Sequence, residues 1–336
     1  MTERGRSPRI SVIVPTRDRP GIVAETVGGL RLQDSPADEH EIVVVDDGSS
    51  PRVDQPVVDP RGPRISVVRL EGKGRSAARN RGADVARGAV VLFVDDDISV
   101  GTGFVRAHLG AQEEWPGSLI VGAISLPASA LDTPFGRFRQ ELERRGLPSG
   151  RGPVTAPNFC AAGNVSISRA RFLELGGFDP MLRSSEDQDL ALRHSAAGGQ
   201  IIFLPEAEGI HRDGAMDLAS YCRRAEWGSE NTIPFCRKHP AWTENIHRDR
   251  VNGWFQPFHE PVSSGLRKLA KAGMAAPSLL RVVLAIVPPI ERAWPRSPVL
   301  GGIYRLVLGA HLLRGYRRGL ARFGPWAASP RDGVAP

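Results

Sequence analysis

The sequence predicts an α/β fold in which short apolar strands alternate with helices around a mostly parallel sheet. The first observation is the alternation itself, since short apolar runs are separated by segments with apolar residues at helical spacing. The second is that one run ends in three adjacent carboxylates, Asp95, Asp96 and Asp97. The third is a change after Asp213, where helices broken by proline replace the strands. We therefore predict an α/β domain over residues 1–213 and a helical region over 214–336.

The first hundred residues carry the clearest alternation. Apolar runs that are too short for helices are expected to form strands. The predicted strands are 10–14, 41–45, 65–68 and 89–94. The predicted helices are one through Val23, Val27 and Leu30 and one over 75–87, where small residues allow close packing. Strands joined in this way are expected to lie parallel, with right-handed crossovers.

The next hundred residues continue the pattern less regularly. Further strands are predicted at 119–126, 163–168 and 201–204, and further helices at 104–114, 135–145, 169–175 and 186–197. Ser185 is expected to cap the last of these helices with its hydroxyl. The helix over 135–145 places Phe135, Phe138 and Leu142 on one face. That face suits either a cover over a cleft or an ordinary surface helix.

Composition is that of a soluble globular protein, with 41% hydrophobic and 24% charged residues. The three cysteines, Cys160, Cys222 and Cys236, lack metal-site spacing and indicate a reducing compartment. The first nine residues are polar and contain no apolar signal-peptide core. We therefore expect a cytoplasmic protein.

The positive charge lies at the end of the chain. The formal net charge is +7, but residues 261–336 hold 12 Lys and Arg against two acids, which leaves −3 for the rest. A nucleic-acid partner for the main domain is therefore not expected, because such a domain needs a basic surface. The basic tail instead permits contact with an anionic membrane surface, on the inner face of the cell membrane.

Two segments of the tail bear on membrane contact. Residues 279–290 are strongly apolar but too short to span a bilayer, and Pro288 and Pro289 interrupt them. Residues 303–323 interleave apolar side chains with arginines. They form either a basic amphipathic helix on a membrane or a helix docked on the main domain, and both alternatives stay open. From about residue 327 we expect disorder.

The three carboxylates after the strand at 89–94 predict a cation. In open α/β sheets, ligands bind at the carboxyl ends of strands. Adjacent acids repel one another unless a cation joins them. Oxygen ligands suit Mg²⁺ or Mn²⁺, which commonly bind phosphates as well. The alternative is an acidic turn that is simply solvated.

A glycine-rich loop at 71–80 enters a predicted helix, whose N-terminus attracts phosphate. The loop lacks the spacing of a Walker A motif, and it lacks the third glycine of a dinucleotide fingerprint. Alone it is a weak signal for a phosphate site.

Together these stretches resemble the inverting glycosyltransferases of family 2, which have the GT-A fold. The matching segments appear in the family's order over residues 10–211. They are 11–16 (SVIVPT), 44–49 (VVDDGS), 74–82 (GRSAARNRG), 93–97 (FVDDD), 176–179 (GGFD) and 186–190 (EDQDL). The resemblance implies a nucleotide-sugar half over about 1–100 and an acceptor half over about 101–213.

The resemblance implies roles on the nucleotide side. Pro15, Thr16 and Arg17 would line the nucleotide pocket, and Asp47 would read the base. Arg79 would lie near the nucleotide or the diphosphate.

The resemblance also implies a metal site. Asp95 and Asp97 would form an Asp-x-Asp motif, with Asp95 toward the ribose, Asp97 on Mg²⁺ or Mn²⁺ and Asp96 in the variable place. The chain departs from the family's frequent fourth acid, because Ile98 stands there, so this assignment rests on register. His211 matches a histidine that completes many such metal sites, although a lone histidine is more often a core or surface residue.

The remaining implied roles concern the sugar and the acceptor. Gly163 and Asn164 would lie near the donor sugar. Asp187 would be the catalytic base, with Glu186 beside the acceptor.

The function implied is transfer of a sugar from a nucleotide diphosphate sugar to an acceptor hydroxyl on a glycan, a lipid-linked molecule or a small molecule. A sugar-nucleotide pyrophosphorylase would need a glycine-rich loop after the first strand, where residues 15–18 read PTRD. A non-catalytic sugar-nucleotide-binding or membrane-scaffold protein is the other alternative, and the acids Asp97 and Asp187 argue against it.

Overall fold

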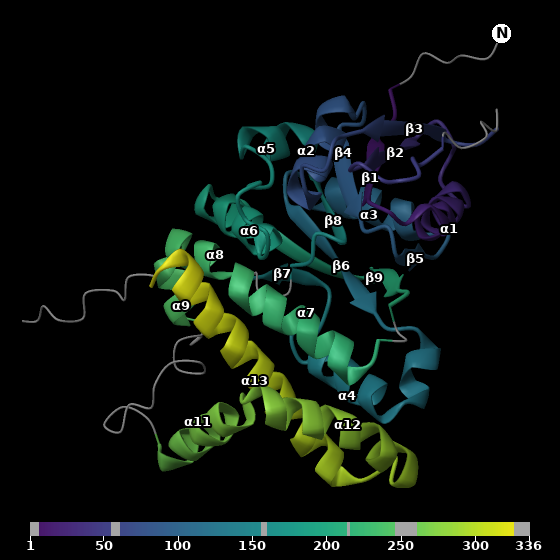
Figure 1. Cartoon of the computed structure of the whole chain (residues 1–336). Helices are drawn as coiled ribbons and strands as arrows, with labels where there is room; N and C mark the ends of the chain where they lie inside the picture. Colours follow the sequence, from purple (N-terminus) through teal and green to yellow (C-terminus); the bar gives the residue numbers. More distant parts are fainter. Residues whose placement is uncertain (1–6, 55–60, 156–159, 214–215, 246–260, 326–336) are drawn as a thin grey trace, which may run out of the picture. The chain divides into compact units, whose positions relative to one another are not determined.

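A computed structural model describes residues 7–54, 61–155, 160–213, 216–245 and 261–325 (Figure 1). The chain divides into two compact units, one of Met1–Pro127 with Leu142–Gly214 and one of Ala128–Glu141 with Ala215–Pro336. The stretch Ala128–Glu141 thus groups with the helical tail, although it precedes residue 213. The predicted disorder from about residue 327 lies outside the described residues, as do the first six residues of the polar N-terminus.

The first unit is built on a nine-stranded sheet in the order β3-β2-β1-β4-β8-β6-β9-β5, with β7 paired to β9. The strands are β1 (Ile10–Thr16), β2 (His40–Asp46), β3 (Arg64–Arg69), β4 (Val90–Val94), β5 (Ile98–Val100), β6 (Leu119–Ser125), β7 (Gly152–Val154), β8 (Asn164–Ser168) and β9 (Ile201–His211). All residues of β1 and β2 are buried. Both strands are therefore buried along their length rather than alternating between buried and exposed residues, as expected when helices cover both faces.

The parallel arrangement holds in one half of the sheet. Strands β3, β2, β1 and β4 pair in parallel, as predicted. In the other half β8 runs antiparallel to β4 and β6, and β5 and β7 run antiparallel to β9. The sheet is therefore mixed. The sequence analysis missed β5 and β7 because three residues are too few to show a pattern.

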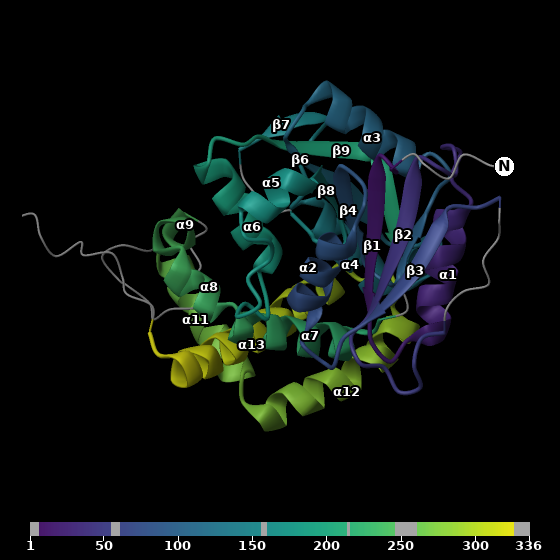
Figure 2. The same cartoon turned by 90° about the horizontal axis from the view of Figure 1, so that it is seen from above.

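Helices cover both faces of this sheet (Figure 2). One face carries α1 (Pro20–Arg31) and α3 (Phe104–Glu114), and the other carries α2 (Arg75–Val85), α5 (Arg169–Glu174) and α6 (Glu186–Ala196). Helix α2 packs closely because of Gly82, where a Cβ atom would lie 2.3 Å from Ile13. Ser185 precedes α6, but its side chain makes no capping hydrogen bond and its φ is +65°.

The second unit is helical. Its elements are η1 (Ala128–Asp132), α4 (Pro134–Arg144, up to Glu141), α7 (Leu218–Asn231), α8 (Ile233–Lys238), α9 (Pro240–Asn245), α11 (Val262–Met274), α12 (Pro277–Ala293) and α13 (Pro298–Phe323). An aromatic cluster lies in its core, where the rings of Phe135 and Phe138 lie 5.4 and 5.1 Å from that of Tyr304. The apolar face of α4 is therefore packed inside this unit.

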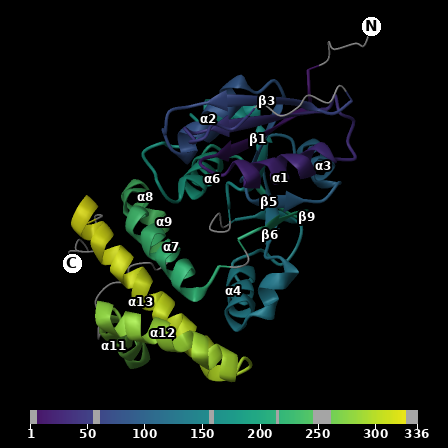
Figure 3. The ribbon, with the colours of Figure 1, turned by 45° about the vertical axis from the view of Figure 1, so that its right-hand side comes forward.

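Helix α13 is a core helix of the second unit. Its buried residues include Tyr304, Val307 and Ala310, and it packs along α7. Helices α7 and α8 lie on one side of α13, and α11 and α12 lie on the other (Figures 1 and 3). The two alternatives for 303–323 were a helix on a membrane and a helix docked on the main domain. The apolar stripe packs on protein, but it packs on α7 of the second unit.

Helix α12 continues through Pro288 and Pro289, where the sequence analysis predicted a break. Both prolines are exposed, and the helix continues although neither residue can donate a backbone N–H to the carbonyl group four residues earlier. Among the described residues no single helix has the length and apolar character to cross a bilayer. Helices α11 and α12 meet that test only as a pair, bent by 90°.

Candidate active site

Carboxylates gather at one edge of the parallel half of the sheet. Strand β1 ends at Thr16, β2 at Asp46 and β4 just before Asp95. These strands are neighbours and run in the same direction, so their carboxyl ends lie side by side. This is the edge at which open α/β sheets bind ligands.

Asp96 and Asp97 share one cation, Arg19. The Oδ2 atom of Asp96 accepts a hydrogen bond from Thr16 Oγ1 at 2.7 Å. Arg19 Nη1 lies 3.3 Å from Asp96 Oδ1 and 3.0 Å from Asp97 Oδ2. Burial opposes the charge of Arg19, but the two carboxylates outweigh it and raise the pKa of the guanidinium. Sequence reasoning passed over Arg19, and the only signal for it was its place after the first strand in the run 17–19.

Arg79 joins Asp95 to Glu186, which lie far apart in the sequence. Its side chain is 1% exposed, and its Nη2 and Nη1 atoms donate to Asp95 Oδ1 at 2.6 Å and to Glu186 Oε1 at 2.9 Å. Burial would raise the pKa of Asp95, but the charge of Arg79 prevails and lowers it. The Arg79 guanidinium therefore links the end of β4 to the start of α6 and keeps Asp95 ionised.

Asp187 lies beside this link at the first turn of α6. Its Oδ1 atom accepts from the backbone N–H of Gln188 at 2.8 Å, and its Oδ2 atom accepts from that of Ala162 at 3.3 Å. Burial, followed by the charge of Glu186, raises the pKa of Asp187 to about 7. A carboxyl group with this pKa is able to take up a proton near neutral pH.

His211 is brought next to Asp97 by strand pairing. Residues Ile98 and His211 are paired in the β5–β9 ladder, so the histidine lies one residue from the end of the acidic turn. His211 Nε2 lies 3.7 Å from Asp97 Oδ1, and its Nδ1 atom lies 2.7 Å from Asp213 Oδ1. The backbone N–H of Arg212 also donates to the Asp97 carbonyl at 2.8 Å, which fixes this corner.

This corner fits a divalent cation whose ligands come partly from the protein and partly from phosphate. Within the described residues no group of three or more His, Cys, Asp or Glu side chains could hold a metal by itself. Asp97 and His211 offer an oxygen and a nitrogen ligand from one side. Mg²⁺ and Mn²⁺ are commonly held by one or two protein ligands, with phosphate oxygens and water completing the shell.

Asp47 organises the glycine-rich loop. Its Oδ1 and Oδ2 atoms accept hydrogen bonds from the backbone N–H groups of Lys73 and Gly74, at 2.7 and 2.8 Å. Neighbouring Asp46 is bound by Arg69 at 2.6 Å and by the backbone N–H of Ser49 at 2.8 Å. Both acids of the 46–49 segment therefore shape the loops around the sheet edge.

Comparison with known proteins identifies the part of the chain that carries the sheet edge. Residues 11–147 match the model of glycosyl transferase family 2. The chain carries a family 2 glycosyltransferase domain. This confirms the resemblance found in the sequence, and the mixed sheet flanked by helices is the GT-A fold.

Relatives extend over more of the chain. A pre-mycofactocin glycosyltransferase of Mycobacterium tuberculosis is 24% identical over 82% of this chain and 58% of its own length. A validoxylamine A glucosyltransferase of Streptomyces hygroscopicus is 27% identical over 70% of this chain and 62% of its own. The chain thus spans about 60% of the length of these curated relatives.

A solved structure has the same fold. The mannosyltransferase PcManGT of Pyrobaculum calidifontis, in complex with GDP-Man and Mn²⁺, superposes with a TM-score of 0.59. The alignment covers 94% of this chain and 88% of that one, at 18% identity.

Two other residues that were predicted to line a nucleotide pocket, Pro15 and Arg17, lie at or just after the end of β1. Pro15 is buried inside β1, next to Thr16. Arg17 is more than half exposed, with its Nε atom 3.5 Å from Asp18 Oδ2. A Cβ atom on Gly72 would lie 3.4 Å from the Arg17 guanidinium, so Arg17 lies over the glycine-rich loop.

Gly163 and Asn164 have different surroundings. A Cβ atom on Gly163 would lie 2.9 Å from Asp95 Oδ2, so this glycine lets the acidic turn approach β8. The Asn164 side chain has no exposed surface. It donates to the carbonyl groups of Ala123 and Ala207 and contacts His108 Nε2 at 2.9 Å. In this structure Asn164 therefore joins β8 to β6, β9 and α3 rather than facing an open donor-sugar space.

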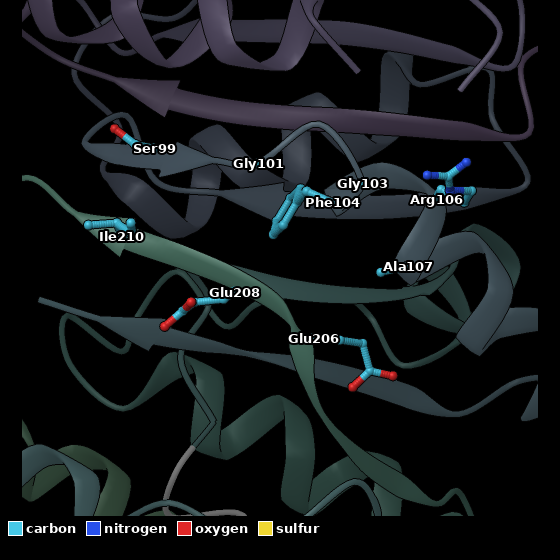
Figure 4. Close-up of a pocket in the computed structure, with 9 residues that line it drawn as sticks. All are labelled: Ser99, Gly101, Gly103, Phe104, Arg106, Ala107, Glu206, Glu208 and Ile210. Atoms are coloured by element: carbon cyan, nitrogen blue, oxygen red, sulfur yellow. The ribbon is translucent and has the colours of Figure 1, made fainter. Parts of the chain in front are cut away.

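A separate hollow of about 490 Å³ lies in the same unit, between β5 and the start of α3 on one side and β9 on the other (Figure 4). Its charged groups already have partners, because Arg106 pairs with Asp34 and Glu206 with Arg151. Glu208 accepts a hydrogen bond from Ser125. We assign no ligand to this hollow.

Proposed function

We propose that this protein is an inverting glycosyltransferase that moves a sugar from a nucleotide diphosphate sugar to an acceptor hydroxyl. The observation that carries the proposal is the chain of contacts from Asp95 through Arg79 to Glu186, next to Asp187. It places a carboxyl group of pKa about 7 close to the sheet edge where the donor would bind. The family match of residues 11–147 supports the same reading.

Donor binding is assigned to the carboxyl ends of β1, β2 and β4. Thr16, Asp47 and Asp95 border this edge, and the loop held by Asp47 leads into the N-terminus of α2. A helix N-terminus favours a negatively charged group. The relative with a bound ligand, PcManGT, holds GDP-Man, which supports a nucleotide diphosphate sugar as the donor class here.

The reaction is a single displacement in which Asp187 receives the proton. The acceptor oxygen forms a bond to the anomeric carbon as the bond from that carbon to the diphosphate oxygen breaks. The diphosphate leaves with the electron pair, and the acceptor proton passes to the Asp187 carboxylate. Attack from the side opposite the leaving group inverts the anomeric carbon.

Asp97 and His211 are the residues that would hold Mg²⁺ or Mn²⁺ together with the diphosphate. A cation there would supply positive charge for the departing diphosphate. Arg19, which contacts Asp97 and Asp96, would have to exchange one of these contacts when a cation arrives. The Mn²⁺ in the PcManGT complex supports the use of a divalent cation, while the choice of Asp97 and His211 rests on their contact in this structure.

The experiment is a panel of nucleotide diphosphate sugars incubated with the protein, with Mn²⁺ and a mixture of hydroxyl acceptors, followed by measurement of the released nucleoside diphosphate. We expect turnover with at least one donor. We expect Asp187→Asn to slow it by about a hundredfold to ten-thousandfold, the usual contribution of a positioned base, while donor binding is kept.

Glu174→Gln is the matched control, because Glu174 is an exposed carboxylate that pairs with Arg171 on the same short helix. It should turn over donor like the unchanged protein. Donor binding without turnover across the panel would instead favour the non-catalytic binder, and normal turnover by Asp187→Asn would remove the carboxylate base.

For the place of action, we propose the anionic inner face of the cell membrane, where the protein would be peripheral. The +10 balance of residues 261–336 supports this location, because basic segments near such a surface gain attraction from its negative potential. Acceptors available there would include lipid-linked molecules and growing glycans.

A further inference from the structure

The exposed apolar side chains of the described residues are concentrated in one stretch. Of the fifteen large hydrophobic residues that are exposed, eight lie between Val262 and Val299. Six of the eight belong to α11 and α12, and the other two follow within the next few residues. Scattered single hydrophobic residues are ordinary on a surface, but such a concentration indicates contact with something apolar.

Helix α11 carries its apolar stripe away from its own unit. Val262, Leu266 and Leu269 are 74%, 64% and 70% exposed and follow the i, i+4, i+7 spacing of one helix face. Gly265, the buried residue of α11, lies at the edge of this stripe, three residues after Val262 and four before Leu269. A helix that served only to cover its own domain would place these side chains inward.

Helix α12 is apolar on two sides. Leu280 and Val287 are buried in the core of the unit. Leu279, Val282 and Ile286 are 41%, 56% and 48% exposed and form a second stripe at i, i+3 and i+7. The first stripe accounts for the packing of α12, and the second has no described protein neighbour that buries it.

Basic residues occur in the same segment as both stripes, on other faces of the two helices. The segment 262–299 holds six Lys and Arg and one acid, Glu291, which accepts a hydrogen bond from Tyr304. The basic residues are Arg267, Lys268, Lys271, Arg281, Arg292 and Arg296. Burial is the main cause that lowers the pKa of Lys271, followed by the charges of Lys268 and Arg267. The Lys271 side chain lies against Gly309 of α13, so it belongs to the inner side of α11.

Trp294 ends this surface beside a hollow. It is 66% exposed and borders a hollow of about 640 Å³ that Arg137, Arg296 and Asp132 also line. Tryptophan is enriched at the boundary between the apolar and the polar layers of a membrane, where one end of the ring is apolar and the other is wet. This combination suits a lipid headgroup region better than a protein core.

We propose that the two exposed stripes, Val262–Leu266–Leu269 of α11 and Leu279–Val282–Ile286 of α12, dock the protein on an anionic phospholipid bilayer. The stripes would enter the headgroup and upper acyl region, and the exposed arginines of the same segment would reach lipid phosphate with their long side chains. The proposal rests on the proposed membrane location and is independent of the chemistry at Asp187. It moves the contact from α13, which is buried against α7, to α11 and α12.

The bilayer is preferred to a second copy of the chain because of charge. Two copies that met through this face would bring twelve basic side chains together with two acids, whereas an anionic lipid surface is complementary to them. Apolar insertion combined with basic contacts is the usual mode of peripheral helices.

The test is co-sedimentation of the full-length protein with vesicles of phosphatidylcholine, with and without phosphatidylglycerol. We expect binding to the phosphatidylglycerol vesicles only, weakening as salt rises, because charges near the surface are screened within about 8 Å at physiological ionic strength. The double variants Leu266→Asp with Leu269→Asp, and Val282→Asp with Ile286→Asp, should each bind at least about tenfold more weakly.

Leu32→Asp with Met181→Asp is the matched control. Leu32 and Met181 are 71% and 80% exposed and lie in the first unit, so the double change adds the same charge to equally exposed sites without touching the stripes. This variant should bind vesicles like the unchanged protein. All four proteins should keep the same thermal unfolding midpoint, because the substituted side chains are exposed.

Three results would overturn the proposal. The first is that the full-length protein does not bind anionic vesicles at low salt. The second is that the stripe variants bind as well as the unchanged protein. The third is that the unchanged protein is a dimer and the stripe variants are monomers. Donor turnover is measured on the same samples. Vesicle binding without turnover would refute the proposed sugar transfer alone, and turnover without vesicle binding would refute the docking alone.

Discussion

The fold opposes ionisation of Asp187, whereas the proposed reaction requires its ionised carboxylate. The first turn of a helix normally favours a negative charge, and two backbone N–H groups donate to this carboxylate. Burial and the neighbouring charge of Glu186 outweigh these donors and raise the pKa of Asp187 to about 7. Arg79 is bound to Glu186 and Asp95 instead, which leaves Asp187 as the carboxyl group able to accept a proton near neutral pH.

The pH dependence of transfer should therefore report Asp187. A base must be ionised, so we expect the rate at saturating donor to fall about tenfold per pH unit below pH 7 and to level off above it. A rate profile between pH 5 and pH 9 measures this. A profile that stays flat down to pH 5 would contradict the role of a base with a pKa of about 7.

Protein stability gives an independent check of the raised pKa of Asp187, because stability should fall over the pH range in which the rate rises. The folded protein keeps a proton on Asp187 up to about pH 7, whereas the unfolded chain loses it near the ordinary pKa of aspartate, so Asp187 lowers stability as the pH rises between these values. Asp187→Asn should thus raise the unfolding midpoint at pH 8 and change it little at pH 4. A loss of stability at pH 8 would show that the buried carboxylate is favoured by the fold.

At the scale of elements, close approach of α7 and α13 forms the core of the second unit. A Cβ atom on Gly315 would lie 2.1 Å from the carbonyl oxygen of Glu226. The buried Glu226 side chain is in turn met by His311 and by Arg318 at 3.0 Å, so the charge is compensated where the helices touch. The absence of a side chain at Gly315 is therefore what permits this helix pair.

Gly315→Ala should destabilise the protein by about 1–3 kcal/mol, because the added methyl group meets backbone that has no room to move. Gly302→Ala is the matched control on the same helix, since nothing lies within 4 Å of its added Cβ atom. Glycine is the poorer helix former, so the control should gain up to about 1 kcal/mol. The free energies of unfolding in urea measure both, and equal values for the two variants would contradict close packing at Gly315.

The sequence predicted strand and helix positions well where one face of each element is regular. Helix α3 has the predicted bounds, and Val23, Val27 and Leu30 are buried in α1 as their spacing requires. It failed where long-range pairing decides the structure. The antiparallel entry of β8 and the three-residue strand β5 depend on partners far along the chain, and no local pattern encodes them.

The site follows the same rule. The carboxylates at strand ends were visible because their position follows from strand direction alone. The Arg79 link, the contact of Arg19 with two acids and the burial of Asn164 were not visible, because each depends on side chains brought together from separate elements. The family resemblance named Arg79 and Asn164, but only the structure gives their partners.

At the scale of the whole molecule, the two units divide the proposed tasks. The first holds the acidic sheet edge, and the second holds the basic residues and the exposed stripes. The charge separation seen in the sequence, −3 before residue 261 and +10 after it, follows this division. A ligand that binds the sheet edge should therefore slow amide hydrogen exchange in the first unit.

Nucleoside diphosphate with Mn²⁺ should stabilise the protein through that edge. A ligand that binds only the folded state adds about 2.7 kcal/mol when its concentration is 100 times its dissociation constant. We expect a rise in the unfolding midpoint with at least one nucleoside diphosphate, which a chelator largely reverses. Amide hydrogen exchange should slow at 16–19, 46–49, 72–79 and 95–97, where the strand ends and the glycine-rich loop lie.

Helix α13 provides the internal control, because it belongs to the other unit and contributes nothing to the proposed donor site. Its exchange should not change. Asp97→Asn should remove the part of the stabilisation that depends on Mn²⁺ while leaving some nucleotide binding, since Asp47 and the loop are intact. Protection confined to α13, or full Mn²⁺-dependent stabilisation of Asp97→Asn, would place the donor and its cation elsewhere on the molecule.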